Sequence, residues 1–329
     1  MFDLKDKRVL LFIPKFFDLS KKVETELNNL GAIVDAYNEK SISSALNRAL
    51  LKVVPFIFKL HTYKYYRSIL NKIKNNKYNY VLFIDCQMAD SRVLSMYRAS
   101  IPDAKFILYL WDSLANLRNT TSKFKYFDKV LSFDRIDCIN NPSIFFRPLF
   151  YSINKNCIID NNQIYDISFV GTIHSDRYSI IKKVSKICEE NNYKLFVFKY
   201  LQSSFIYYFY KIIKPEFEDT KYADFSYKSI ANTDVQRIIS ESKIILDINN
   251  PKQDGLTTRP IEALVNGKKL ITTCSDIKNY DFYNSKNVLI IDRNKPTISR
   301  DFVDMPFVPI SIEIMNRYSF RAWAEDVFN

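Results

Sequence analysis

The sequence predicts an α/β protein of two domains, each built around a parallel, doubly wound sheet, and three observations carry this prediction. The chain has 329 residues, which is enough for two domains with a core each. Short apolar runs, typical of strands buried on both faces, alternate with segments of helical periodicity. The alternation starts again after residue 165, as expected if a second domain repeats the architecture of the first.

In the first half, Asp18 can cap a helix that ends at Gly31. A long helical region follows at about 41–76, and a shorter helix is predicted near 90–100. The strands are expected at residues 8–13, 32–36, 80–85, 105–110, 129–133 and 144–147. Residues 151–165 are polar and lack periodicity, so we place the domain boundary there.

In the second half, Asp176 can cap one helix and Thr233 or Asp234 another, and a third helix is predicted at 258–266. The strands are expected at residues 166–170, 194–198, 243–248, 269–273 and 287–291. Residues 311–328 are predicted to form a terminal helix.

Composition narrows the class of protein. Hydrophobic residues make up 47% and charged residues 26%, the balance of a soluble globular protein. No stretch reaches the roughly 18 apolar residues of a membrane-spanning helix. Acidic residues precede the first apolar run and no cleavage site follows it, so we interpret this run as a strand and not as a signal peptide. Five cysteines without a C-x-x-C motif, and only two histidines, argue against a zinc site and fit reduced thiols in a cytosol.

The net charge of +12 fits an anionic membrane, a phosphorylated substrate or nucleic acid as partner, or simply a lysine-rich composition. No nucleic-acid-binding module is present, so nucleic acid is not an expected partner. Segment 199–214 interleaves aromatic residues with lysines, which suits a membrane-surface element. Packing beneath the second domain is the alternative for this segment.

The strongest local signal lies at 253–267, where the sequence reads QDGLTTRPIEALVNG. A strand ends, a loop passes through Gly255, and a helix begins near Thr258 with Pro260 in its first turn. Gly255 is one of only four glycines, and a chain so poor in glycine is expected to keep it where the backbone needs positive φ or close approach by a ligand.

Free N–H groups at such a helix start, together with the helix dipole, suit a diphosphate. Arg259 adds positive charge, and Glu262, one turn into the helix, can accept hydrogen bonds from two ribose hydroxyls. An ordinary capped helix is the alternative. The predicted binding residues here are Asp254, Gly255, Leu256, Thr257, Thr258, Arg259 and Glu262.

This block resembles the E-x₇-E motif of GT-B glycosyltransferases. A carboxylate, seven residues and a glutamate run from Asp254 to Glu262, and the following ALVNGKKLITT is similar to the small-residue helix, glycine and strand of that family. The resemblance implies that Glu262 holds the nucleotide ribose and that Asp254 lies beside the donor sugar. This chain departs from the motif in having Asp for Glu at the first position, where the side chain is one methylene shorter.

The wider chain is similar to bacterial polysaccharide and lipopolysaccharide glycosyltransferases of the CgeB-like type. The resemblance rests on LWDS at 110–113, SFVGTIHSDRY at 168–178, the 253–273 block and YDFYN at 280–284. It implies the GT-B fold, with two Rossmann-like domains facing a cleft. An acceptor domain would cover 1–155, a nucleotide-sugar domain 156–310, and helix 311–329 would pack back on the first domain through Phe320 and Trp323.

The resemblance also implies a transferase of the hexosyltransferase type that uses a nucleotide-sugar donor, with a UDP-sugar expected. The acceptor would be a glycan or lipid-linked glycan of a surface polysaccharide, capsule or lipopolysaccharide. The protein would be cytoplasmic and peripheral at the inner face of the membrane.

A glycine turn at the end of the second domain's first strand is a further predicted contact with the donor. In VGTIHSDR, Gly171 permits close approach, while His174 and Arg177 can contact phosphate or sugar. Lys199 and Lys228 are further candidates to neutralise the diphosphate. Solvated surface roles are the alternative for each of these charged side chains.

In the first half, strand 80–85 ends in Asp85, and strand 105–110 is followed by Trp111 and Asp112. Because carboxyl ends of parallel strands share an edge of the sheet, both carboxylates are expected near the acceptor. Asp112 is the expected general base, with Asp85 as its rival, and Trp111 can stack on a sugar ring. A capping role for Asp112 and a core position for Trp111 are the alternatives.

No Asp-x-Asp motif occurs, so no metal and no cofactor besides the donor are expected. Helix N–H groups and basic side chains would then stabilise the leaving diphosphate. Two other readings stay open, namely a sugar-nucleotide epimerase on the same fold and a non-catalytic nucleotide- or sugar-binding protein. A dinucleotide-dependent dehydrogenase is unlike this chain, because no G-x-G-x-x-G follows any strand.

Overall fold

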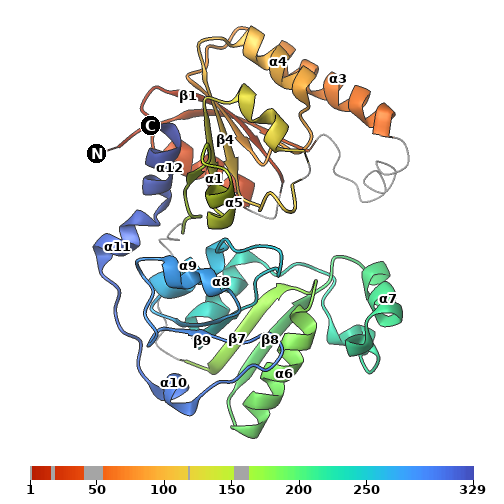
Figure 1. Cartoon of the computed structure of the whole chain (residues 1–329), viewed down its shortest axis with the longest axis vertical. Coiled ribbons are helices and arrows are strands. Elements are labelled where there is room, and N and C mark those ends of the chain that lie inside the picture. Colours follow the sequence, from red (N-terminus) through yellow and green to blue (C-terminus); the bar gives the residue numbers. More distant parts are fainter. Residues whose placement is uncertain (1, 16–18, 41–54, 118, 152–162) are drawn as a thin grey trace. The chain divides into compact units, whose positions relative to one another are not determined.

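The computed structural model describes residues 2–15, 19–40, 55–117, 119–151 and 163–329. Its contacts divide the chain into two compact units (Figure 1). Unit 1 comprises Met1–Leu149 together with Phe320–Asn329, and unit 2 comprises Phe150–Ser319. Each unit contains one sheet of parallel strands. The predicted fold class, α/β with two parallel sheets, is therefore confirmed.

The sheet of unit 1 has the order β2-β1-β3-β4-β5-β6. Its strands are β1 (Arg8–Ile13), β2 (Ile33–Asn38), β3 (Tyr80–Ile84), β4 (Lys105–Leu110), β5 (Lys129–Ser132) and β6 (Phe145–Phe146). The central strands β1, β3 and β4 are buried almost throughout, as expected of a sheet covered on both faces, whereas edge strand β2 is only partly buried.

The helices of unit 1 close over an aromatic core. Before residue 150, the described helices are α1 (Leu19–Asn29), α3 (Pro55–Ile73), α4 (Ser91–Ser100) and α5 (Arg135–Asn140), with a 3₁₀ segment η1 (Thr121–Tyr126). Phe12 of β1 stacks on Phe83 of β3 with ring centroids 4.5 Å apart, and Tyr66 of α3 and Tyr97 of α4 pack against Phe12. The predicted cap Asp18 and the predicted helical residues 41–54 lie outside the described residues.

The predicted terminal helix over 311–328 is in fact two helices, α11 (Ile312–Arg317) and α12 (Phe320–Phe328). The helix breaks because the Tyr318 carbonyl accepts a hydrogen bond from the Tyr151 N–H at 2.9 Å, in a parallel bridge of Tyr151 with Ser319. Only α12 belongs to unit 1. Its Trp323 lies edge-on to Tyr109 of β4 at 5.1 Å between ring centroids.

The sheet of unit 2 has the order β11-β10-β9-β7-β8. Its strands are β7 (Tyr165–Thr172), β8 (Leu195–Tyr200), β9 (Ser242–Asp247), β10 (Lys269–Thr272) and β11 (Val288–Ile290). Besides α11, its described α-helices are α6 (Arg177–Glu190), α7 (Ser204–Ile213), α8 (Asn232–Ser240), α9 (Thr258–Val265) and α10 (Arg300–Asp304). Ile167 and Phe169 of β7 pack in one apolar core with Ile244 and Leu246 of β9.

Two predicted helix caps of unit 2 differ from the structure. Helix α8 begins at Asn232 with Ala231 at its N-cap, so Thr233 and Asp234 lie inside the first turn, where Asp234 pairs with Arg237 at 3.8 Å. Asp176 does precede α6, but its side chain makes no cap hydrogen bond, because its carboxylate is bound elsewhere.

Candidate functional site

The carboxyl edge of the unit 2 sheet is where a ligand site is expected from topology. The chain leaves β7 toward β8 on one side, and β9, β10 and β11 extend the sheet on the other side. Ligands of open α/β sheets bind outside the carboxyl ends of the strands at such a reversal. Thr172 ends β7 and Asp247 ends β9, and most of the predicted donor-binding residues follow one of these two strands.

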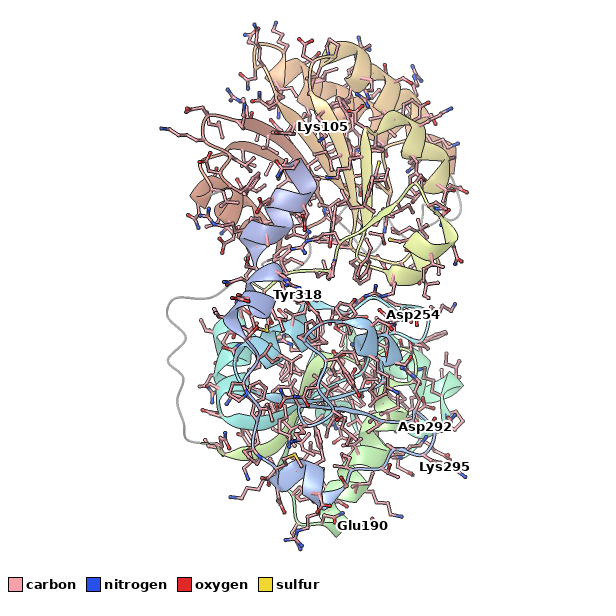
Figure 2. All side chains as sticks on the ribbon, turned by 60° about the vertical axis from the view of Figure 1, so that its left-hand side comes forward. Lys105, Glu190, Asp254, Asp292, Lys295 and Tyr318 are labelled. Carbon is pink, nitrogen blue, oxygen red and sulfur yellow. The ribbon has the colours of Figure 1, made fainter. Side chains whose placement is uncertain are left out.

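The loop before α9 is held in place by polar contacts. The side-chain amide of Asn249 donates to the Gln253 carbonyl at 2.8 Å, and the Cys274 thiol lies 3.1 Å from the Asp254 carbonyl. Leu256 is 2% exposed and anchors the loop in the core. Asp254 is labelled in this loop in Figure 2.

The start of α9 leaves its backbone donors open. Thr257 occupies the N-cap but makes no side-chain cap hydrogen bond, and Pro260 removes one of the two N–H groups that could donate to it. Within the described part of the chain, no backbone hydrogen bond has the N–H of Leu256, Thr257 or Thr258 as its donor. These N–H groups and the helix dipole can therefore bind an anion.

Glu262 is held by its neighbour on the same helix. Arg259 Nη1 lies 3.3 Å from Glu262 Oε2, and the two side chains are 27% and 13% exposed. Arg259 is predicted to add positive charge near a diphosphate, and in the structure its guanidinium pairs with the carboxylate that is predicted to bind ribose. Arg259 can thus orient Glu262, and its positive charge also opposes the rise that burial causes in the pKa of Asp247.

Gly171 has a packing reason to be glycine. A Cβ at this position would lie 2.9 Å from the ring of Phe169, which is too close for any side chain without movement of that ring. The glycine therefore lets the end of β7 pack against the Phe169 ring, and this packing explains the glycine without any contact to a ligand.

His174 lies in the loop after β7, and Arg177 is the first residue of α6, directly after this loop. The Arg177 guanidinium donates to the Ile248 carbonyl at 2.6 Å and to the Thr172 carbonyl at 3.0 Å, so it ties this loop to the end of β9. Burial, aided by the charge of Arg177, lowers the pKa of His174 to about 4. A neutral imidazole can donate a hydrogen bond to a ligand but adds no positive charge near neutral pH.

A network around Arg293 joins three loops at this edge. Its guanidinium binds the Asp176 carboxylate through two contacts of 2.8 and 2.9 Å. It also donates to Asn249 Oδ1 at 2.7 Å and to Thr273 Oγ1 at 2.9 Å. Arg293 and Asn249 are not among the residues predicted from the sequence. The sequence could have pointed to them because polar residues follow the ends of β9, β10 and β11. The carboxyl ends of these strands must lie at one edge of a parallel sheet.

Lys199 belongs to β8, and Lys228 lies in the segment before α8. The Lys199 ammonium lies 5.7 Å from the Tyr178 ring centroid and 5.3 Å from that of Phe225, and burial lowers its pKa. Lys228 is exposed, and its carbonyl accepts a hydrogen bond from the Ser226 hydroxyl. Lys199 thus makes cation–π contacts with the unit 2 core.

In unit 1, the loop after β3 has an unusual backbone. Asp85 and Cys86 are consecutive non-glycine residues with φ of 65° and 50°. Asp85 is 3% exposed, its Oδ1 accepts the Trp111 N–H at 3.0 Å, and burial raises its pKa well above the usual range. Such strain is found where a side chain must be held in a set position.

Two buried charged residues, neither of them predicted from the sequence, support this loop. Glu39, which is fully buried after β2, accepts the Met88 N–H at 2.5 Å through Oε1. The Lys123 ammonium donates to the carbonyls of Cys86 at 2.6 Å and Gln87 at 3.1 Å. Neither residue belongs to a motif, so only the adjacency of β2 and β3 to β1 could have suggested Glu39.

Asp112, the other predicted base, lies half-buried in the turn after β4. Its Oδ1 accepts the Ser113 N–H at 2.9 Å and the Asn116 side-chain amide at 2.8 Å. Trp111 is also half-buried and so is not a core residue. The structure thus gives Asp112 a turn-capping role, while Asp85 occupies the more strongly perturbed environment.

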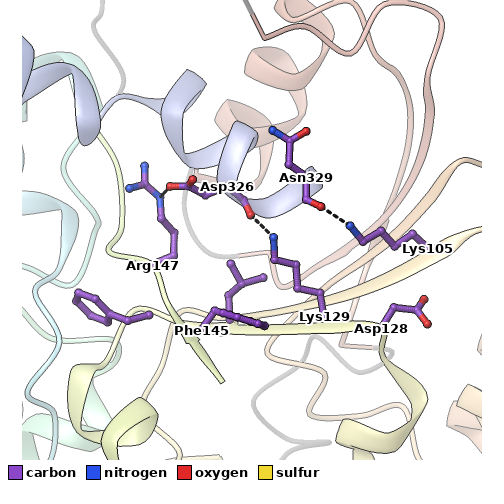
Figure 3. Close-up of a pocket in the computed structure, with 9 residues that line it drawn as sticks. Lys105, Asp128, Lys129, Phe145, Arg147, Asp326 and Asn329 are labelled. Atoms are coloured by element: carbon purple, nitrogen blue, oxygen red, sulfur yellow. Dashed lines mark hydrogen bonds and ion pairs between the residues drawn. The ribbon is translucent and has the colours of Figure 1, made fainter. Parts of the chain in front are cut away.

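A cavity of about 510 Å³ in unit 1 lies at a different edge of the sheet (Figure 3). Lys105 and Lys129, the first residues of β4 and β5, line it with residues of α12. Their ammonium groups donate to the carbonyls of Asn329 and Asp326, each at 2.6 Å. The cavity thus lies where α12 packs against the amino-terminal ends of two strands, away from Asp85 and Asp112.

Within the described ranges, no three His, Cys, Asp or Glu side chains gather as a metal site would require. No helix of the described chain is both long enough and apolar enough to cross a bilayer.

A scan against protein-family models and a search of curated proteins each find no match. Solved structures do match over nearly the whole chain. The chain is similar to a glycosyltransferase from Rickettsia africae, with 14% identity, a TM-score of 0.52, and coverage of 98% of this chain and 94% of that one. It is similar to the catalytic domain of starch synthase IV from Arabidopsis thaliana, bound to ADP and acarbose, with 7% identity, a TM-score of 0.56, and coverage of 98% and 94%.

The chain has the GT-B fold. A third similar structure is the N-terminal domain of trehalose-6-phosphate phosphatase from Candida albicans, with 10% identity, a TM-score of 0.54, and coverage of 97% of this chain and 88% of that chain. These three proteins differ in activity, and their sequence identities to this chain are low. The structural similarity therefore shows the fold alone, and the activity must be inferred from the site.

Proposed function

We propose that this protein transfers a sugar from a nucleotide-sugar donor to a glycan acceptor. The observation that carries the proposal is the start of α9, where open N–H groups stand one turn before Glu262 at the carboxyl edge of the unit 2 sheet. The N–H groups suit a diphosphate and the carboxylate suits ribose hydroxyls. The fold, which this chain shares with a starch synthase determined with ADP, supports the same reading.

In the proposed donor complex, the backbone of 255–259 binds the diphosphate and Glu262, oriented by Arg259, accepts the ribose hydroxyls. Asp254 lies at the start of this loop, next to the position expected for the donor sugar. The helix N-terminus then stabilises the negative charge that develops on the leaving diphosphate. Neutral His174 supplies a hydrogen-bond donor on the other loop. This scheme requires no metal ion, and metal independence is part of the proposal.

For the acceptor hydroxyl we propose a carboxylate base on unit 1. Asp112 is one candidate because it follows β4 directly and is half-buried beside Trp111. Asp85 is the other, because its strained loop and its supports, Glu39 and Lys123, fix its position. General-base assistance of this kind typically contributes about 10²–10⁴-fold to the rate.

We further propose a UDP-hexose donor and a lipid-linked acceptor of a surface polysaccharide, capsule or lipopolysaccharide, used at the inner face of the cytoplasmic membrane. Helix α7 supports the lipid part of this proposal. It carries apolar residues on all sides, and one stripe faces solvent, comprising Phe205, Tyr208, Phe209 and Ile212, which are 76%, 58%, 48% and 84% exposed. A helix with apolar residues on all sides is normally buried against protein or lipid. Contact with a lipid interface would bury this exposed stripe.

A thermal-shift panel of UDP-, GDP-, dTDP- and CMP-sugars tests the proposal, because a ligand of the folded state raises the unfolding midpoint by mass action. We expect one nucleotide class to raise the midpoint, with and without EDTA. The stabilising donor is then incubated with membrane extracts, and release of its nucleoside diphosphate is followed. No shift with any nucleotide sugar would contradict the proposal, and conversion of the donor into an isomeric nucleotide sugar would identify an epimerase instead.

A further inference from the structure

A long stretch of unit 1 contains no acidic residue. Between Glu39 and Asp85 the sequence has no Asp or Glu, yet it has nine Lys and Arg residues. Unit 1, residues 1–149 and 320–329, has 25 Lys and Arg against 16 Asp and Glu, and so carries +9 of the net charge of +12. The excess positive charge is therefore concentrated in unit 1.

Helix α3 carries much of this charge on its outer side. Its inner side is buried through Tyr66, Ile69 and Ile73, which turns the remaining positions to solvent. With Arg92 of α4, the exposed cations of α3 and of the turn after it form what we call the basic face, comprising Lys59, Lys64, Arg67, Lys72, Lys74, Lys77 and Arg92. None of these side chains pairs with a carboxylate of a described residue.

Helix α4 packs beside α3 and extends the same face (Figure 1). The Tyr97 hydroxyl of α4 donates to the Tyr66 carbonyl of α3 at 2.8 Å, and the Arg92 guanidinium lies over the Tyr63 ring, 3.9 Å from its centroid. Neither helix contains Asp or Glu. Asp90, which directly precedes α4, caps this helix by accepting the Val93 N–H, so its carboxylate is already engaged.

The lysines of segment 199–214 are differently placed. Lys211 donates to the Thr220 carbonyl and Lys214 to the Ser175 carbonyl, while Lys199 lies over two aromatic rings. Four acidic residues follow closely at Glu216, Glu218, Asp219 and Asp224. The aromatic part of the predicted membrane element is exposed on α7, but unopposed positive charge is found on α3 instead.

We propose that the basic face of α3 and α4 binds the anionic phospholipid headgroups of a membrane. Clusters of four to eight cations on an amphipathic helix attract anionic lipid by about 1 kcal/mol, or roughly fivefold in partitioning, per charge near the surface. Leu60, 47% exposed and one turn before Lys64, adds an apolar side chain among the cations. That combination fits an interface with headgroups outside and acyl chains beneath.

A nucleic-acid surface has a different composition. Single strands are bound by aromatic platforms that alternate with cations in a groove, and duplexes by an element that enters a groove. On α3 the aromatic side chains Tyr63 and Tyr65 are half-buried, and Tyr63 is covered by Arg92. Among the α3 side chains that the structure describes, the exposed large apolar one is Leu60, which favours lipid over bases.

Vesicle co-sedimentation of the full chain tests the proposal. The vesicles are phosphatidylcholine alone or phosphatidylcholine with phosphatidylglycerol, at low and at physiological salt. The test variant is Lys64→Glu with Arg67→Glu, two exposed positions on one face of α3. The matched control is Lys182→Glu with Lys186→Glu, two exposed lysines of α6 in unit 2, which changes the net charge by the same amount.

We expect the wild type to sediment with anionic vesicles but not with neutral ones, and less so as salt rises. The α3 variant should partition about 30-fold or more weakly, because two attractive charges are lost and two repulsive ones gained, and the control should keep most of its binding. Equal losses in both variants, or no loss in the α3 variant, would overturn the proposal. So would wild-type binding to a short DNA duplex without binding to anionic vesicles.

The basic face shares no residue with the donor site, so membrane binding and nucleotide binding can fail independently. The thermal shift with the stabilising nucleotide sugar, measured on the α3 variant, serves as its folding control. An α3 variant that keeps this shift and loses vesicle binding supports the proposal. Wild-type protein that binds vesicles but no nucleotide sugar would support membrane binding by the basic face and contradict the proposed donor site.

Discussion

Arg293 and Asp176 form a bidentate ion pair, with Nε–Oδ2 and Nη2–Oδ1 distances of 2.8 and 2.9 Å. The same guanidinium also bonds Asn249, and Asn249 in turn holds the Gln253 carbonyl of the loop before α9. A single side chain from the loop after β11 thereby fixes the loops that begin α6 and precede α9. Both loops border the proposed donor site.

Replacing Arg293 by alanine should lower the free energy of unfolding by about 2 kcal/mol, because charge-assisted hydrogen bonds are lost and partly buried acceptors are left without a donor. Arg293→Lys should recover little of this, since an ammonium cannot make the bidentate contact. Urea unfolding measures the change. Lys295→Ala, at an exposed neighbouring position (Figure 2), is the control, and equal stability of the Arg293→Ala and Lys295→Ala variants would contradict the role given to Arg293.

The fold could be predicted from the sequence because each central strand is a continuous apolar run and each run is followed by a helix signal. The start of α9 was also predictable, since Gly255, Pro260 and the apolar spacing after it all act locally. Arg293 and Glu39 could not be found this way. Their roles depend on which strands become neighbours in the sheet, and local sequence patterns do not predict the strand order.

Glu262→Ala should weaken binding of the stabilising nucleotide by at most about 3 kcal/mol, the range for loss of charge-assisted hydrogen bonds. Glu262→Gln should weaken it less, because the amide oxygen still accepts. Calorimetric titration with the nucleotide measures both effects. Glu190→Ala, at the exposed end of α6 (Figure 2), should bind like the wild type, and unchanged affinity in a folded Glu262→Ala variant would reject the ribose assignment.

The two candidate bases can be separated by paired substitutions. If Asp112 is the base, Asp112→Asn should reduce turnover about 10²–10⁴-fold while sparing donor binding. If Asp85 is the base, Asp85→Asn should do so and Asp112→Asn should retain near-normal turnover. Steady-state turnover and donor affinity are measured on both variants. Normal turnover in both would exclude a carboxylate base on either strand end and favour a retaining mechanism.

Protonation of His174 should destabilise the folded protein. Its pKa is about 4 in the folded state against an ordinary 6.5, so the unfolded chain takes up a proton first as pH falls. The stabilisation from neutral His174 is complete above about pH 6.5 and is lost as pH falls toward about 4. The unfolding free energy of the wild type minus that of the His174→Gln variant should therefore decrease as pH falls across this window. A gap independent of pH would show that the imidazole is not held neutral by burial.

A crystal structure of the protein with the nucleotide that stabilises it most would locate the donor site. We predict density for the diphosphate within hydrogen-bond distance of the backbone N–H groups of 255–259, and for the ribose hydroxyls at the Glu262 carboxylate. A nucleotide bound elsewhere, such as in the unit 1 cavity lined by Lys105 and Lys129, would contradict the proposed donor site.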